Sequence, residues 1–286
     1  MLRSLLVCAA LLGLMPAAQA APALWEASDG DSRVWLFGSI HLLPPGLKWR
    51  TRLFNETLAE ADKVYFETDI GAEAQMEIAD LAFERGFNVD GTLLSNLLDE
   101  DEIEALRTAA AQVNTPMPVL LTMKPWMAAN TLSVAAATVA GFDMNTGVDL
   151  VLQTELPEEK KGYFETGAEQ LEFIAGAPGD EQIEMLMATI ADTDRASAML
   201  DALLASWRAG TPEEIADIFL AELGAQNEAF MDRLIYQRNR NWMTPIEAML
   251  ADDVEALVVV GTGHLVGDGS VIDLLEEAGY TVRQVQ

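Results

Sequence analysis

The stretches "VWLFGSIHLLP", Val34–Pro44, and "VVVGTGHLVGDG", Val258–Gly269, decide how this sequence folds. In each of them an apolar run with the composition of a buried strand ends in the pattern Gly-x-x-His. The chain has only 2 histidines, His41 and His264, and both close this pattern. Ligand sites in sheet-and-helix folds form at the carboxyl ends of the strands. The two motifs therefore predict that both histidines meet at one edge of a sheet.

Two further strand-like segments carry a glutamate near their carboxyl ends. "KVYFETD", Lys63–Asp69, carries Glu67, and "KGYFETG", Lys161–Gly167, carries Glu165. Both segments are rich in aromatic residues, as strands are, and helical patterns precede them or separate them from each other. We expect Glu67 and Glu165 to join the histidines at the same sheet edge.

Neutral imidazole and carboxylate together favour a divalent transition metal. His41, His264 and Glu67 would hold the ion and leave positions for water, which is the catalytic type of metal site. Gly38 and Gly261 would let the backbone turn sharply or approach closely where each strand ends.

Each residue also has a structural interpretation. A histidine after a strand can be a hydrogen-bonded structural residue, and Glu67 or Glu165 can cap a helix or pair with an arginine. The glycines of "GTGHLVGDG" could instead cradle a phosphate at a helix N-terminus, and Gly267 and Gly269 could simply form turns. The matching context of the two histidines favours a shared site over these alternatives.

The first residues have the layout of a secretory signal peptide. Arg3 precedes an apolar run, and Ala18-Gln19-Ala20 forms a small-residue cleavage site. We expect residues 1–20 to be removed, so that the mature chain begins at Ala21 in a periplasm or outside the cell. Cys8 lies in the signal, and the mature chain has no cysteine for a disulfide.

The formal net charge of −29 restricts the partners of the protein. Such a surface repels nucleic acid and anionic lipid, and it attracts divalent cations. The weakly polar run 123–141 is too short and too polar for a membrane span and predicts a buried helix. A peptide or a small molecule is the expected substrate, and the sequence leaves the oligomeric state open.

The order of the predicted elements indicates an α+β fold, with a mixed central β-sheet and helices packed around it. The Asp-Gly turn in "DGDS", Asp29–Ser32, predicts an antiparallel hairpin at the start. No linker-like or low-complexity segment interrupts the chain. Residues 21–286 are therefore expected to form a single domain.

The chain resembles the TraB/GumN family (TraB/PrgY/GumN), which includes the Tiki proteases. The resemblance rests on "LFGSIHLLP", "YFETD", "DGTLLSNL", "KPW", "GVDLVL", "YFETGAEQ", "QRNRNW" and the long segment that begins "VVVGTGHLVGDG", in the order of the family. The paired family motifs fall on Gly38–His41 and Gly261–His264, and the acidic family position falls on Glu67. The Arg-Asn pair of the family falls on Arg238 and Asn239.

The resemblance implies a metal-dependent peptidase with manganese or cobalt as the metal, zinc being a further candidate, and a fold shared with erythromycin esterases and ChaN proteins. In this hypothesis Glu165 acts as a general base or holds a ligand, and Arg238 steadies an oxyanion or a substrate carboxylate. Gln237 departs from the family, where glutamate is common. The alternative is a non-catalytic protein that sequesters a peptide or a haem-like ligand in the same cleft.

Overall fold

The computed structural model describes residues 21–223 and 228–286. The predicted signal peptide, residues 1–20, lies outside the described residues. The described chain contains a six-stranded sheet in the order β4-β3-β5-β2-β1-β6. Its strands are β1 (Leu24–Ser28), β2 (Arg33–Ser39), β3 (Lys63–Phe66), β4 (Lys161–Tyr163), β5 (Ala256–Gly261) and β6 (Thr281–Gln284).

The sheet is mixed, as the sequence predicts. Strands β2, β5, β3 and β4 are parallel neighbours. Strand β1 pairs antiparallel with β2 and with β6. The hairpin predicted at Asp29–Ser32 is the β1–β2 connection. Because the four parallel strands point the same way, their carboxyl ends lie at one edge of the sheet. The α+β fold is confirmed.

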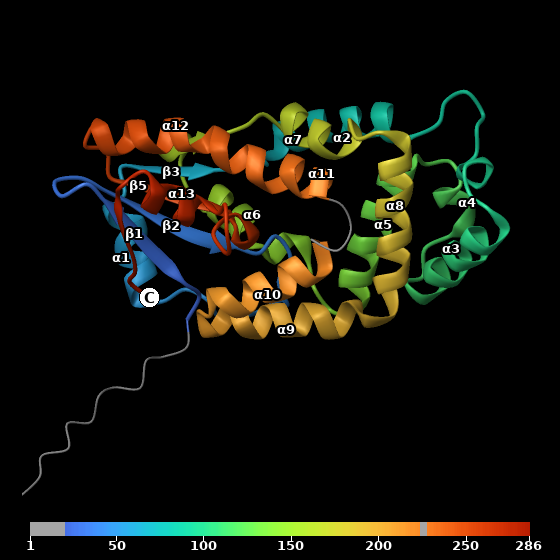
Figure 1. Ribbon diagram of the computed structural model, residues 1–286, viewed down its shortest axis with the longest axis horizontal. Coiled ribbons are helices and arrows are strands. Elements are labelled where there is room, and N and C mark those ends of the chain that lie inside the picture. The colour runs from blue at the N-terminus through green and yellow to red at the C-terminus, as the bar shows by residue number, and fades with distance from the viewer. Residues whose placement is uncertain (1–20, 224–227) are drawn as a thin grey trace, which may run out of the picture.

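Helices surround the sheet and continue beyond it. Figure 1 shows the sheet toward one end of the molecule and helices α3, α5 and α8 toward the other. The helices are α1 (Arg52–Glu60), α2 (Ala72–Gly86), α3 (Glu100–Gln112), α4 (Met117–Leu120), α5 (Pro125–Val139), α6 (Val148–Glu155), α7 (Gly167–Ala175), α8 (Gly179–Asp192), α9 (Ala196–Ala209), α10 (Pro212–Leu223), α11 (Glu228–Met231), α12 (Gln237–Ala251) and α13 (Val271–Glu277).

Single helical turns join several of these elements. They are η1 (Leu94–Asn96), η2 (Met144–Thr146), η3 (Glu158–Lys160), η4 (Thr193–Arg195), η5 (Asp232–Tyr236) and η6 (Thr262–His264). The turn η5 is a π-helix that leads directly into α12, whereas the others are 3₁₀ turns. In the part of the chain that the structure describes, no helix combines the length and the apolarity needed to cross a membrane.

The two faces of the sheet bury separate apolar clusters. Alternate residues of a strand point to opposite faces. Phe37 of β2 packs on one face with Phe54 of α1 and Trp207 of α9. Leu36 of β2 packs on the other face with Trp242 of α12. A third cluster joins α3, α5 and α8 away from the sheet, and the run predicted as a buried helix forms its α5 wall.

Candidate functional site

Glu67 follows the last residue of β3 and turns its carboxylate into the sheet edge. Its Oε1 accepts the backbone N–H of Gly261 at 2.7 Å. Its Oε2 accepts bonds from Nε2 of Gln170 at 2.9 Å and from Nη2 of Arg238 at 2.6 Å. Burial opposes the charged form, but the charges of Arg238 and His41 and the N–H of Gly261 outweigh it and hold the pKa of Glu67 well below its usual range. Glu67 is thus a buried, ionised carboxylate.

Glu165 lies beside Glu67 because the parallel pairing continues past the strand ends. The N–H of Glu165 donates to the carbonyl of Glu67 at 2.9 Å. The predicted strand over Lys161–Gly167 ends at Tyr163, since Thr166 caps α7 through a reciprocal capping box with Glu169. The turn between them leaves the Glu165 side chain facing α12.

Arg238, in the first turn of α12, ties these groups together and is only 3% exposed. Its Nε donates to both oxygens of Glu165 at 2.9 and 3.1 Å, and Nη2 bridges Glu67 and Glu165. Its Nη1 donates to the carbonyl of Leu234 at 3.2 Å and contacts Nε2 of His264 at 3.0 Å. An arginine has five N–H donors. Every one of them has a partner here.

The bond from Arg238 also fixes the state of His264. A guanidinium can only donate, so Nε2 of His264 accepts and the ring proton is on Nδ1. That nitrogen lies 2.6 Å from Oδ1 of Asn239, whose Nδ2 donates to the carbonyl of Gly269. Burial, with the charge of Arg238, lowers the pKa of His264 to about 3. The imidazole is therefore neutral.

Trp242 closes the buried side of this cluster. Its ring lies 4.4 Å from the ring of His264 and under the guanidinium of Arg238. Its Nε1 donates to Oε1 of Glu165 at 3.0 Å. Burial raises the pKa of Glu165, although the bonds from Arg238 and Trp242 oppose that rise. The two glutamates and the arginine thus form a network shielded from water.

His41 differs from His264 because its side chain is 58% exposed. Its Nδ1 lies 2.8 Å from Oδ2 of the buried Asp149, and Oδ1 of that aspartate accepts a bond from Ser39 at 3.0 Å. The charge of Asp149 raises the pKa of His41 to about 9. Asp149 thus orients the imidazole of His41 through Nδ1, and Nε2 does not contact the aspartate.

The sequence "GVDLVL" explains how Asp149 reaches His41. A Cβ at Gly147 would collide with the carbonyl oxygen of His41, so only glycine lets α6 begin there. The N–H of Val148 donates to the carbonyl of Ile40 at 3.0 Å. Asp149, in the first turn of α6, is therefore held against the imidazole. Aspartate is also favoured at a helix N-terminus, which is where the backbone dipole stabilises its charge.

Gly261 marks the point where the two motifs converge. A Cβ at this position would lie 3.1 Å from Oε1 of Glu67, 3.5 Å from Nε2 of His41 and 3.7 Å from Cδ2 of His264. A Cβ at Gly38 would lie 2.8 Å from Oγ1 of Thr262. Both motif glycines are thus needed for close approach.

All the site residues predicted from the sequence lie at this edge: His41, Glu67, Glu165, Arg238 and His264. Sequence reasoning missed Asp149 and Gln170 as contacts of the site. Among the described residues, no group of three or more His, Cys, Asp or Glu side chains is arranged to hold a metal ion. Gly267 and Gly269 have positive φ, the backbone conformation expected of turn glycines.

The fold and the site define a class of protein: an α+β protein with paired Gly-x-x-His motifs at the carboxyl edge of its parallel strands. The chain belongs to the TraB/PrgY/gumN family, whose family model matches residues 23–284. This match spans both motifs and nearly the whole chain. Comparison with curated proteins and with solved structures gives no significant match.

Proposed function

We propose that the protein is a periplasmic or secreted hydrolase of the peptidase type, in which His41 and Asp149 carry the acid–base chemistry. One observation supports this most directly. An exposed imidazole is oriented by a buried carboxylate, and its Nε2 faces Gly261 beside the Glu67–Arg238–His264 network. A base held by an orienting acid is the arrangement that general acid–base catalysis requires.

In the proposed reaction, Nε2 of His41 in its neutral form, whose share grows as the pH rises toward the pKa of about 9, removes a proton from a water molecule as the water oxygen attacks an amide carbonyl carbon. The tetrahedral intermediate then breaks its C–N bond, and His41 returns the proton to the departing nitrogen. The products are a carboxylic acid and an amine. Asp149 keeps the imidazole in the tautomer that this step needs.

Arg238 has a positioning role in this proposal. Its donors are all engaged by protein groups, so it holds Glu67, Glu165 and His264 in place and has none free for a substrate oxyanion. Glu165 likewise keeps both oxygens on Arg238, with Trp242 as a further donor. These residues form the wall against which the reacting groups are placed.

The divalent ion expected from the sequence, manganese or cobalt before zinc, remains a separate part of the proposal. His41, His264 and Glu67 would hold it, and a bound metal would acidify water. Their donor atoms have the right chemistry, but Nε2 of His264 accepts from Arg238 and both oxygens of Glu67 accept hydrogen bonds. With these hydrogen bonds in place, the side chains of His264 and Glu67 do not fit a divalent ion. Binding would require Arg238 to withdraw.

The test compares Asp149→Asn with Asp180→Asn, since both aspartates occupy the second position of a helix and Asp180 is exposed. Hydrolysis of a fluorogenic peptide library should fall about 10²–10⁴-fold in Asp149→Asn and in His41→Ala. Asp180→Asn should match the parent. Equal rates in all four proteins would refute the role of the pair.

Elemental analysis of the same four samples tests the metal. A stoichiometric ion that is lost together with activity in His41→Ala supports the metal-loaded form, as does inhibition by a chelator. Full activity without any divalent ion supports acid–base catalysis by the protein alone. Ligand sequestration without catalysis is the second candidate, and a large apolar pocket beside the site favours it.

A further inference from the structure

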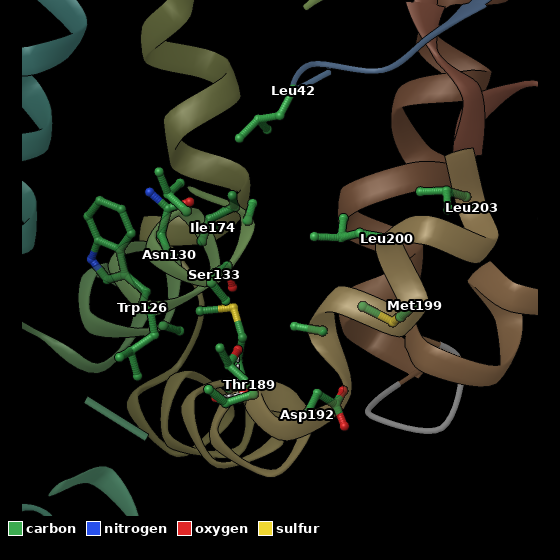
Figure 2. Close-up of a pocket in the computed structure, with 18 of the residues that line it drawn as sticks. Leu42, Trp126, Asn130, Ser133, Ile174, Thr189, Asp192, Met199, Leu200 and Leu203 are labelled. Carbon is green, nitrogen blue, oxygen red and sulfur yellow. Dashed lines mark hydrogen bonds between the residues drawn. The ribbon is translucent and has the colours of Figure 1, made fainter. Parts of the chain in front are cut away.

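An elongated apolar pocket of about 480 Å³ lies between α5, α8 and α9. Figure 2 shows Asn130 and Ser133 of α5 on one side and Leu200 and Leu203 of α9 on the other. Alanine, leucine, methionine and isoleucine supply most of the remaining wall. This volume is within the range of pockets that bind small ligands, which are also mostly apolar with a few polar groups.

The pocket is lined by residues that neighbour the candidate site in the chain, although His41, Glu67 and Asp149 do not line it. Leu42, which lines it, directly follows His41. On α7, Gln170 donates to Glu67, and Ile174, four residues further on the same helix face, lines the pocket. Four residues advance a helix by about 6 Å. One end of the pocket therefore lies near the reacting groups.

Helix α9 makes the same connection from the opposite wall. The Nε1 of Trp207 donates to the carbonyl of Gly38, within the first Gly-x-x-His motif, at 2.8 Å. Leu203 and Leu200 lie one and two turns earlier on that face and line the pocket. Two segments, at Leu42 and on α7, thus join the pocket to the site, and α9 joins it to the backbone of the first Gly-x-x-His motif.

The shape and chemistry of the walls restrict what can enter. The lining residues of α5 extend from Trp126 to Ala137, about 16 Å along the helix axis. A peptide backbone in this space would need a partner for each buried N–H and C=O, and apolar walls supply few. Among the described lining residues Asp192 is the charged one, and it pairs with Arg195 at 2.6 Å.

We propose that this pocket binds an uncharged, unbranched acyl chain and presents the amide at its head to His41. The strongly negative protein and the acid at Asp192 disfavour an anionic ligand. This placement of the amide rests on the proposed hydrolase function, but binding of the chain does not. An N-acylated peptide or amino-acid amide is the substrate class that results.

The experiment uses N-acetyl-, N-octanoyl- and N-dodecanoyl-glycinamide, each below its micelle concentration, with the full mature protein. Calorimetry should show affinity rising up to about fourfold with each added methylene until the pocket is full. Dodecanoyl-glycinamide that binds no more tightly than the acetyl compound would overturn the proposal. So would tighter binding of an uncharged apolar tetrapeptide, which would indicate a peptide groove.

Two matched substitutions locate the bound chain. Ser133→Phe fills the pocket from an exposed position of α5, whereas Ser197→Phe adds the same ring to an exposed position of α9 that does not line it. Binding of the dodecanoyl compound should fall at least tenfold in Ser133→Phe and stay unchanged in Ser197→Phe. Asn130→Phe repeats the test one turn away should Ser133→Phe fail to fold. Equal affinity in a folded pocket variant and in the control places the chain elsewhere and refutes the site.

The Asp149→Asn variant separates this inference from the hydrolase proposal. Chain-length-dependent binding that persists in that variant supports the pocket, whether or not the parent hydrolyses anything. The parent could instead cleave peptides at rates that do not depend on acyl length and bind none of the acyl compounds. That result would support the hydrolase proposal and refute the pocket proposal.

Discussion

Replacing Arg238 with methionine should expose how much the buried network depends on one guanidinium. The change removes the charge shared by Glu67 and Glu165 and the donor that His264 accepts from. Both carboxylates would then be buried near each other without the guanidinium that bonds to both of them. Removing one partner of a buried ion pair costs about 3–5 kcal/mol. We expect a loss of that size in the free energy of unfolding at pH 7.

Arg240→Met is the matched control, because it lies on the same helix two residues further along. Arg240 is half exposed and pairs with Asp232 at 2.9 Å. Exposed ion pairs contribute less than about 1 kcal/mol, so this variant should unfold close to the parent. Urea unfolding followed by tryptophan fluorescence measures both. A cost for Arg238→Met within about 1 kcal/mol of the control would refute the account of the network.

The pH dependence of the same cost tests its origin. Arg238 lowers the pKa of both Glu67 and Glu165, so its removal should raise both values in the folded state. When the pKa of a carboxyl group is higher in the folded than in the unfolded protein, the free energy of unfolding falls as the pH rises. The cost of Arg238→Met should therefore shrink between pH 7 and pH 5. A cost that does not change over this range points to lost packing instead of unpaired charge.

Further predictions concern single positions. Gly261→Ala places a Cβ 3.1 Å from Oε1 of Glu67 and should cost about 1–3 kcal/mol in urea unfolding, whereas Gly179→Ala meets nothing within 4 Å and should be neutral or stabilising. Because the pKa of His264 is lowered to about 3 in the folded protein, stability should fall as the pH drops from about 6.5 toward 3, by at most about 1.4 kcal/mol per pH unit. His264→Leu should remove this contribution, and an unchanged pH profile of urea midpoints would show that His264 is not its source. Protein recovered after export should begin at Ala21, and an intact mass that retains Met1 would contradict the signal peptide.

The strand-end residues could be predicted because the alternation and composition of strands are local properties. The apolar runs before His41, Glu67 and His264 end close to where the sequence indicates, and parallel strands then bring these residues to one edge. Glu165 lies beside Glu67, as the two similar strand ends predict, although its strand is shorter than the pattern indicates. The pattern Thr166-x-x-Glu169 is a capping box that begins α7, and it indicates that the strand must end before Thr166.

The partners of these residues could not be read in the same way. Asp149 reaches His41 only because Gly147 lets α6 start against the backbone of His41, and Gln170 reaches Glu67 only through the packing of α7. Such contacts depend on how helices distant in sequence lie on the sheet, which no local pattern records. The engagement of every donor of Arg238 likewise follows from the tertiary structure alone.

The position of β5 in the sheet has a consequence for how the chain is made. This strand comes near the end of the sequence, yet it lies between β2 and β3, which come near the beginning. A ribosome must therefore finish almost the whole polypeptide before the central strand can join its neighbours, and pairing of such distant segments is slow. Nascent chains that stop before Ala256 would contain β2 and β3 without the strand that connects them.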